Sequence, residues 1–117
     1  MSNESLIEYF KSLGWHIEII LGSDRLYYTV IRDYHINVGS LVDRICDVAI
    51  QQNNTIPFVL SSAIHTRPHL VPMNMQNALR TQNSGIGAEW QYWSRILTKE
   101  PTPQNIVAHI ATIFSEV

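Results

Sequence analysis

The feature that most constrains the fold is a run of strand-like segments enclosed by two segments of helical periodicity. Residues 15–22, 25–34, 41–51 and 56–62 are rich in β-branched and aromatic residues, and in the first segment apolar and polar residues alternate. Because successive side chains of a strand point to opposite faces, this alternation lays one apolar face on a core. Polar or glycine-containing breaks separate the segments, so they predict a four-stranded antiparallel meander. Pro57 restricts the fourth strand to a sheet edge or to its own first residues.

Helical segments begin and end this pattern. Residues 3–13 place apolar side chains at helical spacing, and Ser2 or Asn3 is the expected N-cap. The last helix is expected to start at Pro103 with Thr102 as its N-cap, because the missing N–H of proline costs nothing at the first helical position. The sequence therefore predicts an α+β fold in the order helix, meander, long loop, helix.

The long loop is the stretch 63–89, which shows no clear period and holds several Pro, Gly and Asn residues. A loop of this length inside a compact domain is usually functional or mobile. Part of it, for instance 74–82, is a candidate helix. We expect 74–88 to be the least ordered internal segment, because few apolar side chains offset the entropy of ordering it.

Composition and charge narrow the class of protein. The 117 residues suffice for one domain with its own core, so we expect a single domain spanning 1–117. The formal net charge is −2 and the eight basic residues are scattered, which argues against nucleic-acid binding. No apolar stretch approaches the roughly 20 residues that span a membrane, and the N-terminus does not read as a signal peptide. We therefore expect a cytoplasmic protein without nucleic-acid or membrane contacts.

Two histidines four residues apart, His65 and His69, have a spacing that suits two metal ligands on one helix face. Pro68 lies between them, and a proline does not belong in a helix interior. No nearby Cys, Asp or Glu completes a site. We expect these histidines to form hydrogen bonds in a loop, and we expect neither a metal nor a cofactor.

The single cysteine, Cys46, excludes an internal disulfide and is a poor candidate nucleophile. It lies in the middle of a predicted strand, on the face assigned to Val42 and Val48, and the charge of Asp47 would raise the pKa of its thiol. A buried, structural cysteine is the expected role. Acidic residues such as Asp43 and Asp47 are expected to be solvated surface charges.

The most unusual local feature is the aromatic segment 89–95. Trp and Arg are over-represented at binding hot spots, so Trp90, Trp93 and Arg95, together with His69, are candidate partner-binding residues. The structural alternative is that both tryptophans pack the loop against the sheet and that Arg95 caps a carbonyl.

In this order of motifs the chain resembles family E of the prokaryotic ubiquitin-conjugating-enzyme-like proteins. The segment 89–95, which contains Trp-Gln-Tyr-Trp-Ser-Arg before a terminal helix, is similar to the Trp-Gln-x-Trp-Ser-Arg signature of that family. Weaker likenesses cover most of the remaining chain, and they lie at 13–15 with 27–34 and 38–39, and at 42–50 with Pro57 and 65–70. The resemblance implies the ubiquitin-conjugating fold, and as partners a ubiquitin-like protein and its activating enzyme.

The chain departs from the ubiquitin-conjugating enzymes at the catalytic loop. Their nucleophilic cysteine follows a His-Pro-Asn motif after the fourth strand, whereas the stretch 67–87 contains no cysteine. The histidine that family E tends to carry after Ser-Arg is Ile96 here. Because thioester chemistry needs a thiolate, the resemblance implies an adaptor or binding subunit in a bacterial ubiquitin-like modification system.

Two alternatives stay open. One is a conjugating enzyme that forms an oxyester on a serine such as Ser84, although the sequence shows no base paired with it. The other is a stand-alone interaction module unrelated to ubiquitin, which could form a homo-oligomer.

Overall fold

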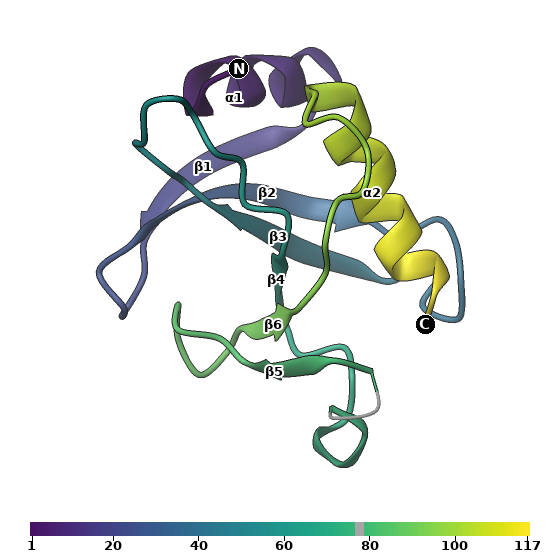
Figure 1. Ribbon diagram of the computed structural model, residues 1–117. Coiled ribbons are helices and arrows are strands. Elements are labelled where there is room, and N and C mark those ends of the chain that lie inside the picture. Colours follow the sequence, from purple (N-terminus) through teal and green to yellow (C-terminus); the bar gives the residue numbers. More distant parts are fainter. Residues whose placement is uncertain (77–78) are drawn as a thin grey trace.

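The computed structural model describes residues 1–76 and 79–117. Its elements in chain order are α1 Asn3–Ser12, β1 His16–Leu21, β2 Tyr27–His35, β3 Ile45–Gln51, β4 Ile64–Arg67, the 3₁₀ turn η1 Met73–Met75, β5 Thr81–Asn83, β6 Gln91–Trp93 and α2 Pro103–Ser115 (Figure 1). The fold is α+β, as predicted, with a helix before the sheet and a helix after it. None of the described helices is long and apolar enough to cross a membrane.

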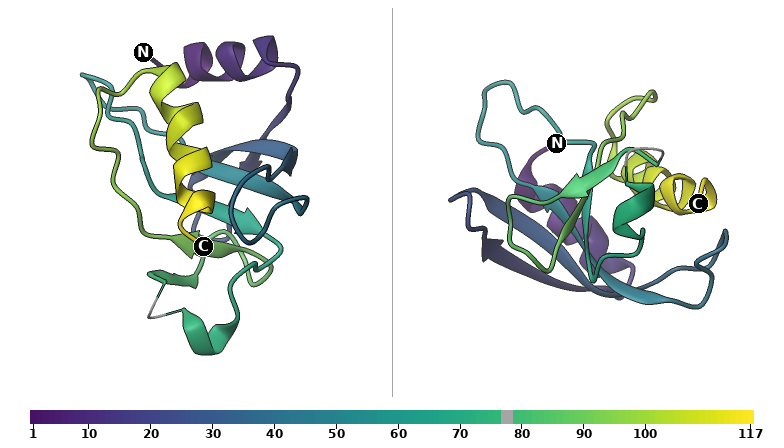
Figure 2. Two further views of the ribbon diagram at one scale, coloured as in Figure 1. Left: turned by 90° about the vertical axis from the view of Figure 1, so that its right-hand side faces the viewer. Right: turned by 90° about the horizontal axis from the view of Figure 1, so that it is seen from below.

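Within the described residues, six strands form one sheet in the order β1-β2-β3-β4-β6-β5, and every neighbouring pair is antiparallel. The first four strands form a meander, whereas the sequence predicted a sheet of four strands only. β5 and β6 extend it beyond β4, with β6 next to β4 and β5 at the edge. α1 lies across the end of the sheet near β1, and α2 runs alongside the sheet (Figures 1 and 2).

Both helices pack on one face of the sheet, which we call the helix face. Leu6 and Phe10 of α1 and Ile110 of α2 are buried in the same cluster as Ile31 and Val48 of the sheet. The helix caps agree with the sequence: the Ser2 side chain accepts from the Ser5 N–H, and the Thr102 side chain accepts from the Asn105 N–H.

A bulge in β2 lets the chain supply three core residues where simple alternation would not. The register shifts between Ile31 and Tyr34, and Asp33 between them has a φ of 54°. This left-handed conformation is one that aspartate tolerates better than most residues. As a result Ile31, Tyr34 and Ile36 all belong to the helix-face core.

The fourth predicted strand is wrong, and the third begins later than expected. Residues 56–62 contain no strand, and β4 lies at Ile64–Arg67, inside the segment predicted to be a loop. Pro57 has no backbone N–H to donate to a neighbouring strand, which disfavours a strand at 56–62. A short apolar run does not by itself show which residues pair with β3. The face assigned to Val42 is also wrong, because Val42 lies outside β3 and is exposed.

Cys46 is buried, which confirms its predicted structural role. Its exposed fraction is 3%, and it lies in the helix-face core beside Tyr34. Burial, with a smaller effect of the Asp47 charge, raises the pKa of the Cys46 thiol to about 12. The thiol is therefore neutral and inaccessible near pH 7.

Replacing Trp93 tests whether burial of its side chain holds β5 and β6 on the rest of the sheet. The Trp93 side chain is fully buried, and its Nε1–H donates to Thr66 Oγ1 at 2.9 Å. We expect Trp93→Ala to lower the free energy of unfolding by about 3–5 kcal/mol, measured by urea denaturation. Tyr27→Ala, at a residue 55% exposed on β2, should cost no more than about 1 kcal/mol. Equal effects of the two substitutions would contradict the packing described.

Candidate functional site

The face of the sheet opposite the helices, here called the rear face, has an apolar half and a charged half. Its apolar half is a cluster of Tyr28, Val30, Ala49, Ile86 and Trp90, with Ile20 packed against it. Ile86 and Trp90 come from the loop 84–90, which folds back over the strands. Although the sequence predicted a loop here, this part of it is packed.

Backbone hydrogen bonds fasten the loop 84–90 to the turn between β1 and β2. The N–H groups of Ser23 and Asp24 donate to the carbonyls of Ile86 and Gly85 at 2.9 and 3.0 Å. A Cβ at Gly85 would lie 2.7 Å from Asp24 Oδ2, so glycine permits this close approach without moving the Asp24 side chain. The Asp24 carboxylate also accepts from the Tyr28 hydroxyl.

The expectations for 74–82 and 74–88 cover residues 77–78, which lie outside the described residues. The described part of the candidate helix is only partly helical, with the 3₁₀ turn at its start and β5 at its end. That 74–88 is the least ordered segment stays a prediction.

His65 and Ser84 form a close polar pair beside the apolar half of the rear face. Nδ1 of His65 lies 2.7 Å from Ser84 Oγ, and the Ile86 N–H donates to the same oxygen at 3.0 Å. Burial lowers the pKa of His65 to about 4, while the Asp24 charge acts in the opposite direction. The imidazole is thus neutral near pH 7, and with Nδ1 unprotonated it can accept the Ser84 proton.

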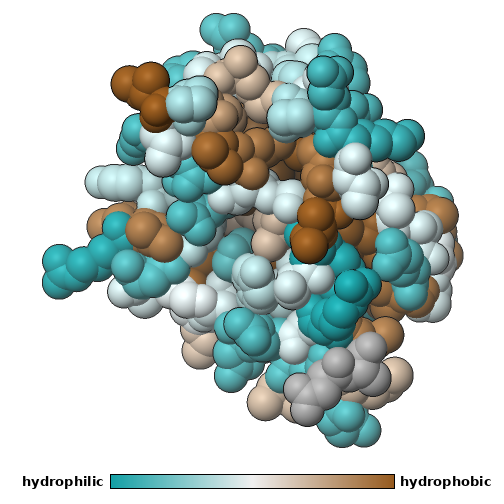
Figure 3. Space-filling view, viewed as in Figure 1, coloured by the Kyte–Doolittle hydropathy of each residue, from teal (hydrophilic) through white to brown (hydrophobic). Residues whose placement is uncertain are grey.

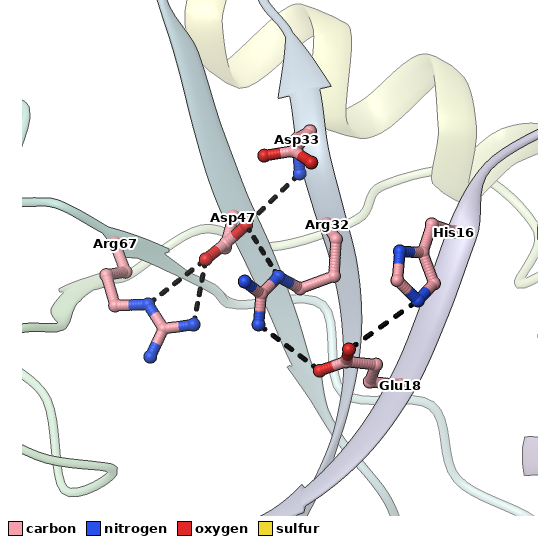
Figure 4. Close-up of polar contacts among 6 residues, drawn as sticks. All are labelled: His16, Glu18, Arg32, Asp33, Asp47 and Arg67. Carbon is pink, nitrogen blue, oxygen red and sulfur yellow. Dashed lines mark hydrogen bonds and ion pairs between the residues drawn. The ribbon is translucent and has the colours of Figure 1, made fainter.

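The charged half of the rear face centres on Asp47 (Figure 4). Asp47 accepts from Arg67 at 2.9 and 3.1 Å, from Arg32 Nε at 3.2 Å and from the Asp33 N–H at 3.1 Å. Glu18 also accepts from Arg32 at 3.2 Å. We call the line of charges formed by Glu18, Arg32, Asp47 and Arg67 the row. The prediction that Asp47 is a solvated charge is wrong, because pairing with two guanidinium groups makes its burial possible.

Arg67 links the two halves of the rear face. Its guanidinium carbon lies 4.6 Å from the centre of the Trp90 ring, while its nitrogens hold Asp47. Both arginines of this row are engaged by carboxylates, so the row ties strands together. Among the described residues, no group of three or more His, Cys, Asp or Glu side chains is arranged to hold a metal ion.

The segment predicted to bind a partner is divided between the two faces. Trp93 is on the helix face, in contact with Phe114, whereas Trp90 is in the rear-face cluster. Residues three apart point to opposite sides of an extended chain, so the two indoles cannot form one surface. Both are buried, which is the arrangement of the structural alternative.

Arg95 and His69, the other two candidate residues, both contact main-chain carbonyls. The Arg95 guanidinium donates to the carbonyls of Leu79, Arg80 and Ser94 at 2.9–3.2 Å. His69 is half-buried, and its Nε2 lies 3.0 Å from the Ala88 carbonyl oxygen. A partner-binding role of these residues stays a prediction, and of the four only His69 is not buried.

Sequence reasoning missed Gln91, the buried residue that fixes the path of the chain after β4. Its side-chain oxygen accepts from the N–H groups of Leu70 and Val71 at 3.0 Å, and its Nε2 donates to the Val71 carbonyl at 2.9 Å. The available signal in the sequence was a glutamine in the middle of an aromatic segment, since a polar side chain among buried residues needs hydrogen-bond partners.

Comparison of the chain with models of protein families, with curated proteins and with solved structures finds no match.

The buried His65 makes stability depend on pH. Its pKa is about 4 in the folded chain and near 6.5 in an unfolded chain, so protonation favours unfolding. This contribution is complete above about pH 6.5 and is lost as the pH falls toward 4, by up to about 3 kcal/mol. Urea denaturation at several pH values measures this loss. The difference in free energy of unfolding between wild type and His65→Gln should shrink as the pH falls from about 6.5 to about 4. His69→Gln, at a half-buried histidine nearby, should instead follow wild type throughout.

Removing the Asp47 charge tests the charged half. We expect Asp47→Asn to lower the free energy of unfolding by about 2 kcal/mol, because both arginines lose their carboxylate. Asp43→Asn is the control, since the Asp43 side chain is 87% exposed and its loss should cost no more than about 0.5 kcal/mol. If the two variants unfold at the same urea concentration, the row contributes nothing to stability.

Proposed function

We propose that this chain is a ubiquitin-conjugating-like adaptor that binds its partners without forming a thioester. In this proposal it serves a bacterial ubiquitin-like modification system, with a ubiquitin-like protein and its activating enzyme as partners. The proposal rests on the resemblance of the segment 89–95 to family E. The order of helix, four-strand meander and final helix supports it.

The observation that carries the non-thioester part is the state of Cys46. It is the only cysteine of the chain, it is buried in the helix-face core, and its thiol has a pKa raised to about 12. A thioester forms by attack of a thiolate on the activated carboxyl group. Neither a thiolate nor access to it is available at Cys46.

An exposed apolar surface supports the binding part. The loop 56–60 carries Ile56, which is fully exposed, and Val59, which is 58% exposed. Apolar side chains gather over the upper half of the face in Figure 3, while its lower half is more hydrophilic. Clusters of exposed apolar side chains commonly mark interaction sites. The adaptor therefore binds the ubiquitin-like protein through the loop 56–60, and the buried tryptophans hold the fold.

The binding test uses two exposed valines outside strands. Val59→Asp places a charge in the loop 56–60, and Val42→Asp places one at a residue 49% exposed between β2 and β3. Calorimetric titration with the ubiquitin-like protein should show binding at least about tenfold weaker for Val59→Asp and nearly unchanged for Val42→Asp. Equal effects, or no binding by wild type, would contradict this assignment.

The covalent test incubates the chain with the ubiquitin-like protein, its activating enzyme and ATP, followed by electrophoresis with and without thiol. We expect no adduct. A thiol-sensitive adduct that disappears in Cys46→Ser would overturn the non-thioester proposal.

The pairing of Ser84 with His65 favours a second candidate, conjugation through an oxyester. Nδ1 of His65 lies 2.7 Å from the serine oxygen and can accept its proton, so a paired base exists that the sequence did not reveal. The low pKa of His65 makes it a weak base, and Ser84 Oγ also accepts from the Ile86 N–H. A thiol-resistant, hydroxylamine-sensitive adduct that is lost in Ser84→Ala would favour this candidate over the adaptor.

A further inference from the structure

A hollow of about 440 Å³ lies between α2 and the segment 94–99 that leads from β6 toward it. The segment runs up beside α2 in Figures 1 and 2. Arg80, Arg95 and Lys99 contribute its basic side chains, and Glu116 contributes its acidic one. Three basic side chains against one acidic side chain give the hollow a positive balance in a chain whose net charge is −2.

Arg95 is the buried charge of this hollow. It is 8% exposed, and within the described part of the chain it forms no ion pair with a carboxylate. Its hydrogen bonds go to three carbonyls, and its buried Nε has no partner. Burial and the neighbouring Arg80 lower the pKa of Arg95, an effect that Glu116 opposes. A buried cation without a counter-charge is costly, and a bound anion would relieve that cost.

The other charges leave a place for an anion. Glu116 is 3.9 Å from Arg80, a long and exposed ion pair that neutralises one of the three cations. Lys99 forms no ion pair among the described residues. Hydroxyl groups of Ser94 and Thr98 also line the hollow, and hydroxyls are common donors to phosphate oxygens.

The remaining lining has an apolar part, which comes from Ile96, Leu97, Ala108 and Ile113, and a polar part from Asn105, His109 and Thr112. A volume of about 440 Å³ is within the range of sites for small molecules. A lone inorganic anion would leave the apolar part of such a hollow without contacts.

From these observations we infer that the hollow between α2 and the segment 94–99 binds a small organic molecule that carries a phosphate group. The phosphate lies near Arg95 and Lys99, and the organic part lies on the apolar lining. This site does not depend on the adaptor function proposed above, and it uses none of the residues of the loop 56–60.

The test is an NMR titration of the full chain at low ionic strength with phenyl phosphate, inorganic phosphate and phenol as probes. We expect saturable shifts of the amides lining the hollow, with phenyl phosphate binding most tightly, inorganic phosphate more weakly and phenol not measurably. Phenol binding as tightly as phenyl phosphate would reduce the site to an apolar hollow and overturn the inference. Equal binding of the two phosphates would overturn the assignment of an organic ligand.

The chain offers a matched pair of variants in its two lysines, Lys11 and Lys99. Lys99→Gln should weaken phenyl phosphate binding by about tenfold, the effect of one charge-assisted contact. Lys11→Gln, on α1 and outside the hollow, should change it by less than about twofold. Arg95→Gln should abolish binding, but the exposed Lys99 decides the test because the Arg95 variant could unfold. Equal effects of the two lysine variants, or no shift with any probe, would refute the site.

Discussion

Trp93 lies where the meander, the added strands and α2 meet. Its backbone pairs with Ile64 of β4 and with Thr81 of β5, and its ring contacts Phe114 of α2 at 5.7 Å between centres. A hairpin of two three-residue strands has little stability by itself. Burial of this one large side chain therefore holds the β5–β6 hairpin, and with it the turn from the sheet into α2.

The rear face shows how a segment with little apolar pattern becomes part of the fold. The loop 84–90 contributes Ile86 and Trp90, and it meets the strands through the carbonyls of Gly85 and Ile86. Beyond it, the row around Asp47 ties together β1, β2, β3 and β4 with charges (Figure 4). With both sheet faces occupied in this way, the apolar side chains of the loop 56–60 are among those that remain at the surface.

Local patterns succeeded where a single element could be read by itself. Both helices and their caps, the first two strands and the burial of Cys46 follow from periodicity and from side-chain chemistry. The prediction of the fourth strand was wrong, because the pairing of Ile64–Arg67 depends on the hydrogen-bond partners that β3 and β6 provide. For the same reason the pairing of His65 with Ser84, from positions 19 residues apart, had no signal in the sequence.

The sequence by itself determined the α+β class, the two amphipathic helices and the absence of any cysteine beyond position 46. These properties depend on residue type and on spacing within one element. Only the tertiary structure decided that the segment 89–95 is divided between two faces, that Asp47 is buried between arginines, and that Arg95 is buried without a carboxylate. Such outcomes depend on which distant segments pack together, since burial and pairing of a charge are properties of its neighbours in space.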